Sequence, residues 1–196
     1  MKMILKPVFA LALLIFVLSG CGLSPQQLYP EPRISGTLER VASGQSVFVT
    51  LDDQRSSSVI GHRGGLYAET NTLTVESSTV FPRLQAETEA ALRMRGFIPV
   101  SERQSGIEFR FSIADLQYSV MEVRTVASKV GLTAVLTVEV HKAGQIYRGR
   151  YTANLDKGFV KPPTDSANNR MISWVMSDAL ERVFNDGGLM RFMASQ

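Results

Sequence analysis

Cysteine is almost absent from this chain: Cys21 is the only one among 196 residues. A single thiol excludes an internal disulfide and any metal site built from several thiolates. Histidine is nearly as scarce, since only His62 and His141 occur, and neither has a Cys, Asp or His at metal-ligand spacing. We therefore expect no disulfide, no metal and no non-covalent cofactor.

Motifs of common catalytic and nucleotide-binding sites are also missing. No serine stands in a Gly-x-Ser-x-Gly turn, and the glycine-rich stretch Gly61–Gly65 lacks the Gly-Lys-Ser/Thr ending of a phosphate-binding loop. The formal charge is only +3, and Lys2 and Lys6 carry two of these charges. We expect a protein that is not an enzyme and that binds no nucleic acid.

Long hydrophobic runs are missing as well. The longest covers the eleven residues Val8–Leu18, whereas a membrane-spanning helix needs about 20. It follows Lys2 and Lys6 and precedes Ser19-Gly20-Cys21, the order that is typical of a bacterial signal peptide. Leu18-Ser19-Gly20-Cys21 resembles the lipobox of bacterial lipoproteins. The resemblance implies cleavage before Cys21, a diacylglyceryl thioether on its sulfur and an acyl chain on its new amine.

Acylation at Cys21 would fix the chain to a membrane, because two or three acyl chains are enough for stable anchoring. Residue 22 is glycine and not aspartate, which, by resemblance to the sorting rule of enteric bacteria, favours the periplasmic face of the outer membrane over the inner membrane. We expect residues 1–20 to be a signal peptide and residues 21–45 the lipidated cysteine with a flexible, proline-containing tether. Residues 46–196 then form a single periplasmic domain.

Strand and helix patterns alternate through that domain. Ile107–Ile113 and Leu116–Val120 alternate in opposite phase, which predicts a β-bulge near Ala114-Asp115. A turn at Ala143-Gly144 would place Val140 opposite Tyr147 and Glu139 opposite Arg148, which favours a hairpin. The other predicted elements are a strand at Val47–Leu51, a short strand at Thr72–Val75, a strand at Val130–Val140, and helices at Val80–Arg95 and Ser166–Asp186.

These elements predict an α+β fold. Two amphipathic helices that cover one face of a mostly antiparallel sheet of about four or five strands would make a two-layer sandwich.

One dense polar cluster follows the first predicted strand. It comprises Asp53, Arg55, Gly61 and Arg63. Asp53 and Arg55 are two residues apart at a strand end, so they could pair and hold the loop. The alternative is a cell-envelope hydrolase in which Asp53 works with an acid such as Glu69 or Glu76.

The same residues carry a resemblance to a known family. The lipobox at Cys21, a Val-rich strand that runs into Asp53-Gln54-Arg55, Ile60-Gly61-His62-Arg63, and a helix that ends in Arg93-Met94-Arg95-Gly96-Phe97 are similar to the YajG family of uncharacterised bacterial lipoproteins. The resemblance extends over nearly the whole chain. It implies localisation and fold, and no biochemical activity.

Three side chains are candidate contacts for an envelope protein partner. Arg148 would lie on the outward sheet face with Glu139, and Phe159 lies in an apolar stretch that either packs locally or contacts a partner. Trp174 lies opposite the apolar stripe of its helix, so it is either covered by Leu189–Met193 or exposed. We therefore expect a lipid-anchored binding or assembly module of the cell envelope.

Overall fold

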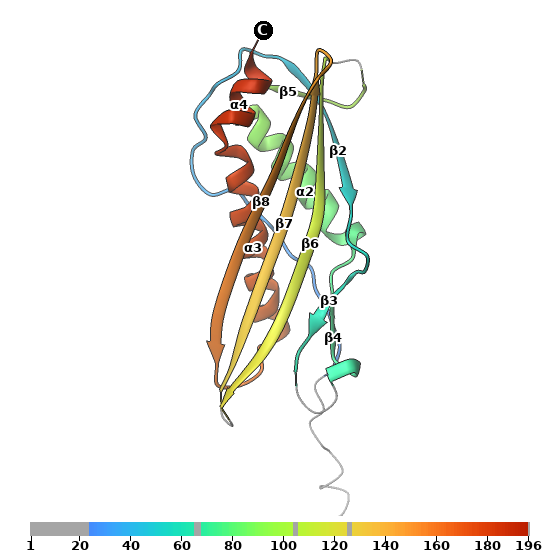
Figure 1. Cartoon of the computed structure of the whole chain (residues 1–196), viewed down its shortest axis with the longest axis vertical. Coiled ribbons are helices and arrows are strands. Elements are labelled where there is room, and N and C mark those ends of the chain that lie inside the picture. Colours follow the sequence, from blue (N-terminus) through green and yellow to red (C-terminus); the bar gives the residue numbers. More distant parts are fainter. Residues whose placement is uncertain (1–23, 65–67, 104–105, 125–126, 196) are drawn as a thin grey trace, which may run out of the picture.

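The computed structural model describes residues 24–64, 68–103, 106–124 and 127–195, which form a long sheet with helices along it (Figure 1). The elements are β1 (Gln26–Gln27), β2 (Ser46–Asp53), β3 (Val59–His62), the short 3-10 helix η1 (Ala68–Thr70), β4 (Thr72–Thr74), α2 (Ser77–Met94), β5 (Ile98–Val100), β6 (Ile107–Arg124), β7 (Ala127–Lys142), β8 (Gln145–Phe159), α3 (Asp165–Phe184) and α4 (Gly187–Ala194).

The central strand is β6. One edge of β6 pairs with β7 in antiparallel register, and β7 pairs in turn with β8. Its other edge is shared, because β2 runs parallel to the first part of β6 and β3 pairs further along, at Tyr118. The predicted bulge is confirmed: the register of β6 shifts between Ile113 and Asp115. The bulge lies beside the end of β2. The last residue of β2, Asp53, pairs with Ile113, and the next backbone N–H, that of Gln54, donates to the carbonyl of Ile113.

The expected sheet was wrong in two respects. The described residues form eight strands and not four or five, and several of the pairings are parallel, including those of β2 with β5 and β6. The missed strands β1, β3 and β5 have two to four residues, too few for a period-2 pattern to stand out. The β7–β8 hairpin is confirmed, with Glu139 opposite Arg148 and Val140 opposite Tyr147.

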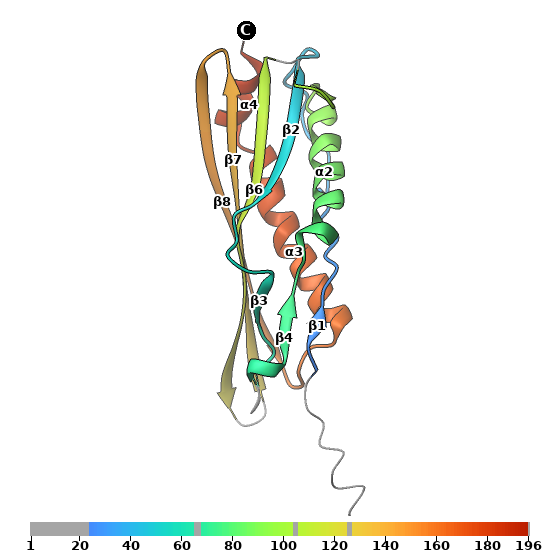
Figure 2. The same cartoon turned by 90° about the vertical axis from the view of Figure 1, so that its right-hand side faces the viewer.

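The two expected helices do lie on one face of the sheet (Figure 2). Helix α2 buries Val80, Leu84 and Leu92, and α3 buries a longer stripe that ends at Phe184. Phe184 stacks on Phe109 of β6 with ring centroids 6.2 Å apart. After α3 ends at Phe184, the chain continues as a helix that was not expected, α4. Asp186 caps α4 by accepting hydrogen bonds from the Gly188 and Leu189 N–H groups.

The residues expected to be a flexible tether are packed against the domain over their described part, residues 24–45. Residues 26–35, which we call the strap, run between α2 and α3 on the side away from β6–β8 (Figure 2). Its even-numbered side chains turn inward, so that Leu28, Pro30 and Pro32 are buried. The buried amide of Gln26 accepts a hydrogen bond from Asn168 of α3. Proline fits this extended segment because the strap lies outside the main strand ladders.

Polar side chains on α3 hold the strap. Backbone N–H groups at alternate strap residues donate to α3 side chains four residues apart, over distances of 2.6–2.8 Å. The pairs are Tyr29 with Asn169, Glu31 with Ser173, Arg33 with Ser177, and Ser35 with Glu181. Two extended residues advance about 6.6 Å and four helical residues about 6.0 Å, so the two repeats stay in step.

Candidate functional site

Asp53 and Arg55 form a bidentate ion pair, as their spacing predicts. The Arg55 Nε and Nη2 donate to the two Asp53 carboxylate oxygens over 2.8 and 2.7 Å. Arg55 Nη2 also donates to the Val75 carbonyl, and the Ser77 hydroxyl at the start of α2 donates to Asp53. The Arg55 side chain is only 4% exposed. This cluster therefore joins the end of β2 to the start of α2.

The surroundings of Asp53 favour the ionised form of its carboxyl group. Partial burial raises the pKa of Asp53, but hydrogen bonds from Arg55 and Ser77 outweigh it and bring the pKa to about 2. A carboxylate that stays ionised and accepts bonds from two fixed donors supports a structural role for Asp53. Of the acids considered for a hydrolase, Glu69 lies in η1 and Glu76 directly precedes α2.

Gly61 allows β3 to lie against β6. A Cβ atom at this position would lie 2.0 Å from the carbonyl oxygen of Tyr118, far inside contact distance. Only glycine fits here without moving one of the two backbones.

Arg63 joins three parts of the chain. Its Nη1 donates to the Ser24 carbonyl over 2.9 Å, and its Nη2 donates to the Pro163 carbonyl over 3.1 Å. Its backbone N–H donates to Asn71. One guanidinium thus holds the first described residue beside the loop that precedes α3. The members of the predicted cluster are therefore not one site: Asp53 and Arg55 form one junction, and Gly61 and Arg63 serve another.

Arg148 lies on the outward sheet face, in a shallow groove of about 750 Å³. Its Nε donates to Glu139 over 2.7 Å. Hydrogen bonds from His141 and then from Arg148 hold the pKa of the Glu139 carboxyl below its ordinary value. Arg110 lies 4.0 Å from the same carboxylate. The negative charge of Glu139 therefore offsets much of the positive charge of Arg148 and Arg110.

Phe159 is the last residue of β8, so the apolar stretch is partly strand. The Phe159 ring is partly buried against the core, which fits local packing, and the Lys157 ammonium lies 5.7 Å from its centroid. The next residue, Val160, is 82% exposed.

Trp174 is exposed and not covered by the C-terminal segment. Its exposed fraction is 51%, whereas Leu189 and Met193 are buried within α4. Tyr29 of the strap is 59% exposed, and both side chains line a groove of about 1050 Å³ between the strap and α3. We call this surface the strap groove. Sequence reasoning missed Tyr29 because it was assigned to the tether.

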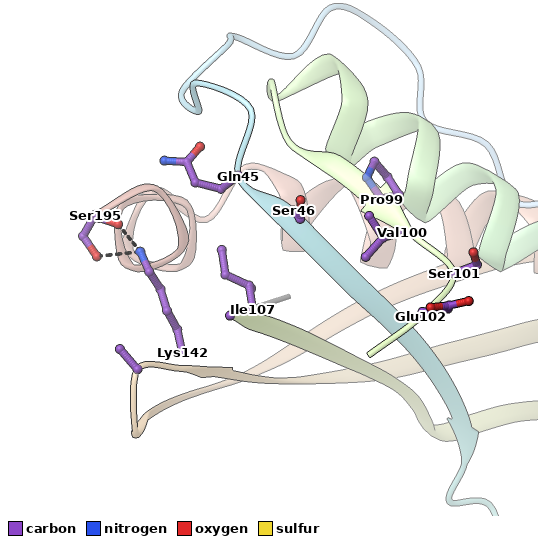
Figure 3. Close-up of a pocket in the computed structure, with 11 residues that line it drawn as sticks. Gln45, Ser46, Pro99, Val100, Ser101, Glu102, Ile107, Lys142 and Ser195 are labelled. Carbon is purple, nitrogen blue, oxygen red and sulfur yellow. Dashed lines mark hydrogen bonds between the residues drawn. The ribbon is translucent and has the colours of Figure 1, made fainter. Parts of the chain in front are cut away.

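A cavity of about 1010 Å³ opens at the far end of the sheet, between the β2–β5 edge and the β7–β8 turn (Figure 3). Its most prominent cation, Lys142, reaches across to Ser195 and also donates to the Met193 carbonyl over 2.9 Å. The ammonium therefore caps the C-terminal end of α4, where a positive charge is favourable.

Within the described ranges, no three His, Cys, Asp or Glu side chains gather as metal ligands would. Over the same residues, no helix combines the length and the apolar character needed to cross a bilayer.

Comparison with known proteins gives a family and several distant structural neighbours. A family described as uncharacterised lipoprotein matches residues 32–194, whereas no curated protein matches the chain. Protein XCC0632 from Xanthomonas campestris is 12% identical with a TM-score of 0.47, and the alignment covers 86% of this chain and 94% of that one. Rare lipoprotein B from Shewanella oneidensis is 11% identical with a TM-score of 0.38, covering 75% and 93%. The family match confirms a lipoprotein at this general level, and the narrower YajG assignment stays a prediction.

Proposed function

We propose that this chain, which belongs to that family of uncharacterised lipoproteins, is a lipid-anchored, non-enzymatic binding or assembly module of the bacterial cell envelope. Acyl chains on Cys21 would hold it at the periplasmic face of the outer membrane. Its partner would be another envelope protein, bound through the strap groove.

The observation that carries this proposal is the pair of exposed aromatic side chains in the strap groove. Trp174 and Tyr29 each leave more than half of their surface in solvent, although large aromatic side chains are normally well covered. Tryptophan, tyrosine and arginine are the residues most enriched among those that dominate protein–protein binding energy. Arg170 and Arg33 line the same groove.

Charged residues surround these aromatics in the manner of an interface rim. Exposed ion pairs join Arg33 to Glu31 and Arg182 to Asp178. A polar rim around a central aromatic contact is the usual anatomy of protein interfaces.

The backbone beneath the groove is held in advance of binding. Tyr29 is carried by the strap and Trp174 by α3, and the four N–H bonds to α3 side chains fix one against the other. A partner would therefore lose little free energy in ordering this surface. A surface that is ordered in advance supports binding of one specific folded partner over binding of many unrelated proteins.

Site-specific photo-crosslinking in cells tests the proposal. A photoreactive residue at Trp174 should give discrete adducts of defined mass. Met94, which is 40% exposed near the end of α2, provides a matched control and should give none. The photoreactive residue placed at Phe159 tests the surface at the end of β8, and placed at Arg148 it tests the outward sheet face. A folded, anchored protein without an adduct at Trp174, or with identical adducts at Trp174 and Met94, would refute the strap groove as the binding surface.

A further inference from the structure

The lipid anchor and the domain are separated by very little free chain. Ser24 is held to Arg63, and the same guanidinium holds Pro163. Only three peptide units separate Ser24 from Cys21, and fully extended they span at most about 10 Å. A lipid on Cys21 would therefore bring the bilayer to this end of the molecule, at which β8 finishes (Figure 1) and the strap begins with β1 (Figure 2).

We propose that this end, which we call the anchor end, rests on the membrane and contacts anionic phospholipid headgroups. Its side chains are Met121, Lys129, Lys157, Phe159, Val160 and Lys161. The proposal rests on acylation of Cys21, and it concerns a different surface from the strap groove.

Exposed apolar side chains are prominent at the anchor end. Val160, at 82%, is the most exposed large hydrophobic residue of the described part of the chain, and Met121 is 52% exposed. The strand register brings these residues together, because Met121 lies opposite Lys129, and Lys129 lies opposite Gly158, two residues before Val160. Exposed apolar side chains beside lysines are characteristic of surfaces that sit in the headgroup layer.

The charge at the anchor end also fits an anionic bilayer. Lys157 and Lys161 are exposed, and neither has an acidic partner among the described residues. Lys129 pairs with Asp156 over 2.8 Å, so that acid is already neutralised. Asp165 belongs to the first turn of α3, where the helix dipole favours it. Each lysine that reaches an anionic surface strengthens membrane binding about fivefold.

The loop that carries Val160 is restrained. Pro162 and Pro163 follow Lys161, and the Pro163 carbonyl accepts from Arg63. Proline fixes its own φ angle and limits the preceding residue to extended conformations. Lys161 is thus held in an extended conformation, next to the point from which the anchored segment leaves.

The full acylated protein, reconstituted in vesicles, provides the test. With the Cys21 sulfur used by the lipid, a cysteine introduced by Val160→Cys is the only free thiol and takes a fluorescent label alone. Ile146→Cys is the matched control, because Ile146 is 46% exposed in the same strand, about 45 Å away at the opposite end. Phospholipids with nitroxide headgroups should quench the label at 160 strongly and the label at 146 hardly at all.

Equal quenching at both positions would show a domain that lies flat, and no quenching at either would show one held off the bilayer; both results overturn the proposal. The pair K157E and K161E, added to Val160→Cys, should abolish the extra quenching that phosphatidylglycerol vesicles give over phosphatidylcholine vesicles. If that difference persists, the lysines do not contact headgroups and the anionic preference is refuted. Mass spectrometry that finds Cys21 unmodified would overturn the orientation together with the anchor, while crosslinks from Trp174 would still report on the strap groove.

Discussion

The substitution Asp53→Asn tests whether the buried ion pair of Asp53 with Arg55 holds the fold or serves a reaction. It keeps the shape of the side chain and removes its charge, which leaves the Arg55 guanidinium, only 4% exposed, without a counter-ion. Loss of one partner of a buried pair costs about 3–5 kcal/mol, and Asp53 is 20% exposed, so we expect a loss of about 2–3 kcal/mol in the free energy of unfolding.

The pKa of Asp53 gives a second estimate of the same quantity. Its value in the folded protein is about 2, against an ordinary 3.8, and this difference corresponds to about 2 kcal/mol. Because the folded pKa is the lower one, this stability is fully present above pH 4 and is lost as the pH falls from about 4 to 2. The wild-type protein should therefore lose more stability over that range than the Asp53→Asn variant.

Urea denaturation followed by circular dichroism measures both effects. Asp178→Asn is a suitable control, because its Arg182 partner is 55% exposed and such pairs contribute at most about 1 kcal/mol. Combining Asp53→Asn with Arg55→Met should cost less than the sum of the two single changes. An Asp53→Asn variant as stable as the control, or one that keeps its stability and loses a measurable turnover, would refute the structural assignment.

Three further substitutions test the backbone geometry, each by its shift in thermal midpoint. Gly61→Ala should cost about 3 kcal/mol or more, because the new Cβ would overlap a β6 carbonyl, whereas Gly158→Ala, which meets open space, should change little. Ala143→Gly should stabilise the β7–β8 turn by about 1 kcal/mol, because Ala143 has a φ of 48°. Ser177→Ala should cost about 1 kcal/mol and speed hydrogen exchange at the Arg33 amide, and unchanged exchange there would contradict the strap contacts.

Local patterns in the sequence predicted the features that depend on neighbouring residues. The change of phase after Ile113 foretold the bulge, since one inserted residue must reverse the alternation. Opposite charges at Glu139 and Arg148 predicted the hairpin register, because cross-strand partners meet directly. The Asp53–Arg55 pair was predictable because opposite charges two residues apart at a strand end lie within reach of each other.

Features that depend on distant segments were not predictable in this way. Three prolines made residues 21–45 look like a tether, although Leu28, Pro30 and Pro32 alternate with polar residues as a half-buried strand would. The regular spacing of acceptors along α3 has meaning only once the strap lies beside it, more than 100 residues away in sequence. The Arg63 contacts with Ser24 and Pro163 likewise join segments with no common pattern. Short parallel strands were missed because their partners arrive through long connections.

The packed strap changes what kind of partner the strap groove can meet. A free tether of more than 20 residues would let the domain search a wide zone of the periplasm, whereas a domain resting on its anchor end keeps each surface at a fixed height. Trp174 lies nine residues into α3, about 14 Å along the helix axis from the anchor end. A protein that contacts Trp174 must then itself reach close to the same membrane. The two proposals are therefore linked. Arg63→Ala removes the bonds to Ser24 and Pro163 and lengthens the free chain between the anchor and the domain, while the α3 bonds still hold the strap. It should weaken crosslinking from Trp174 to a membrane-embedded partner and leave crosslinking to a freely diffusing periplasmic partner unchanged.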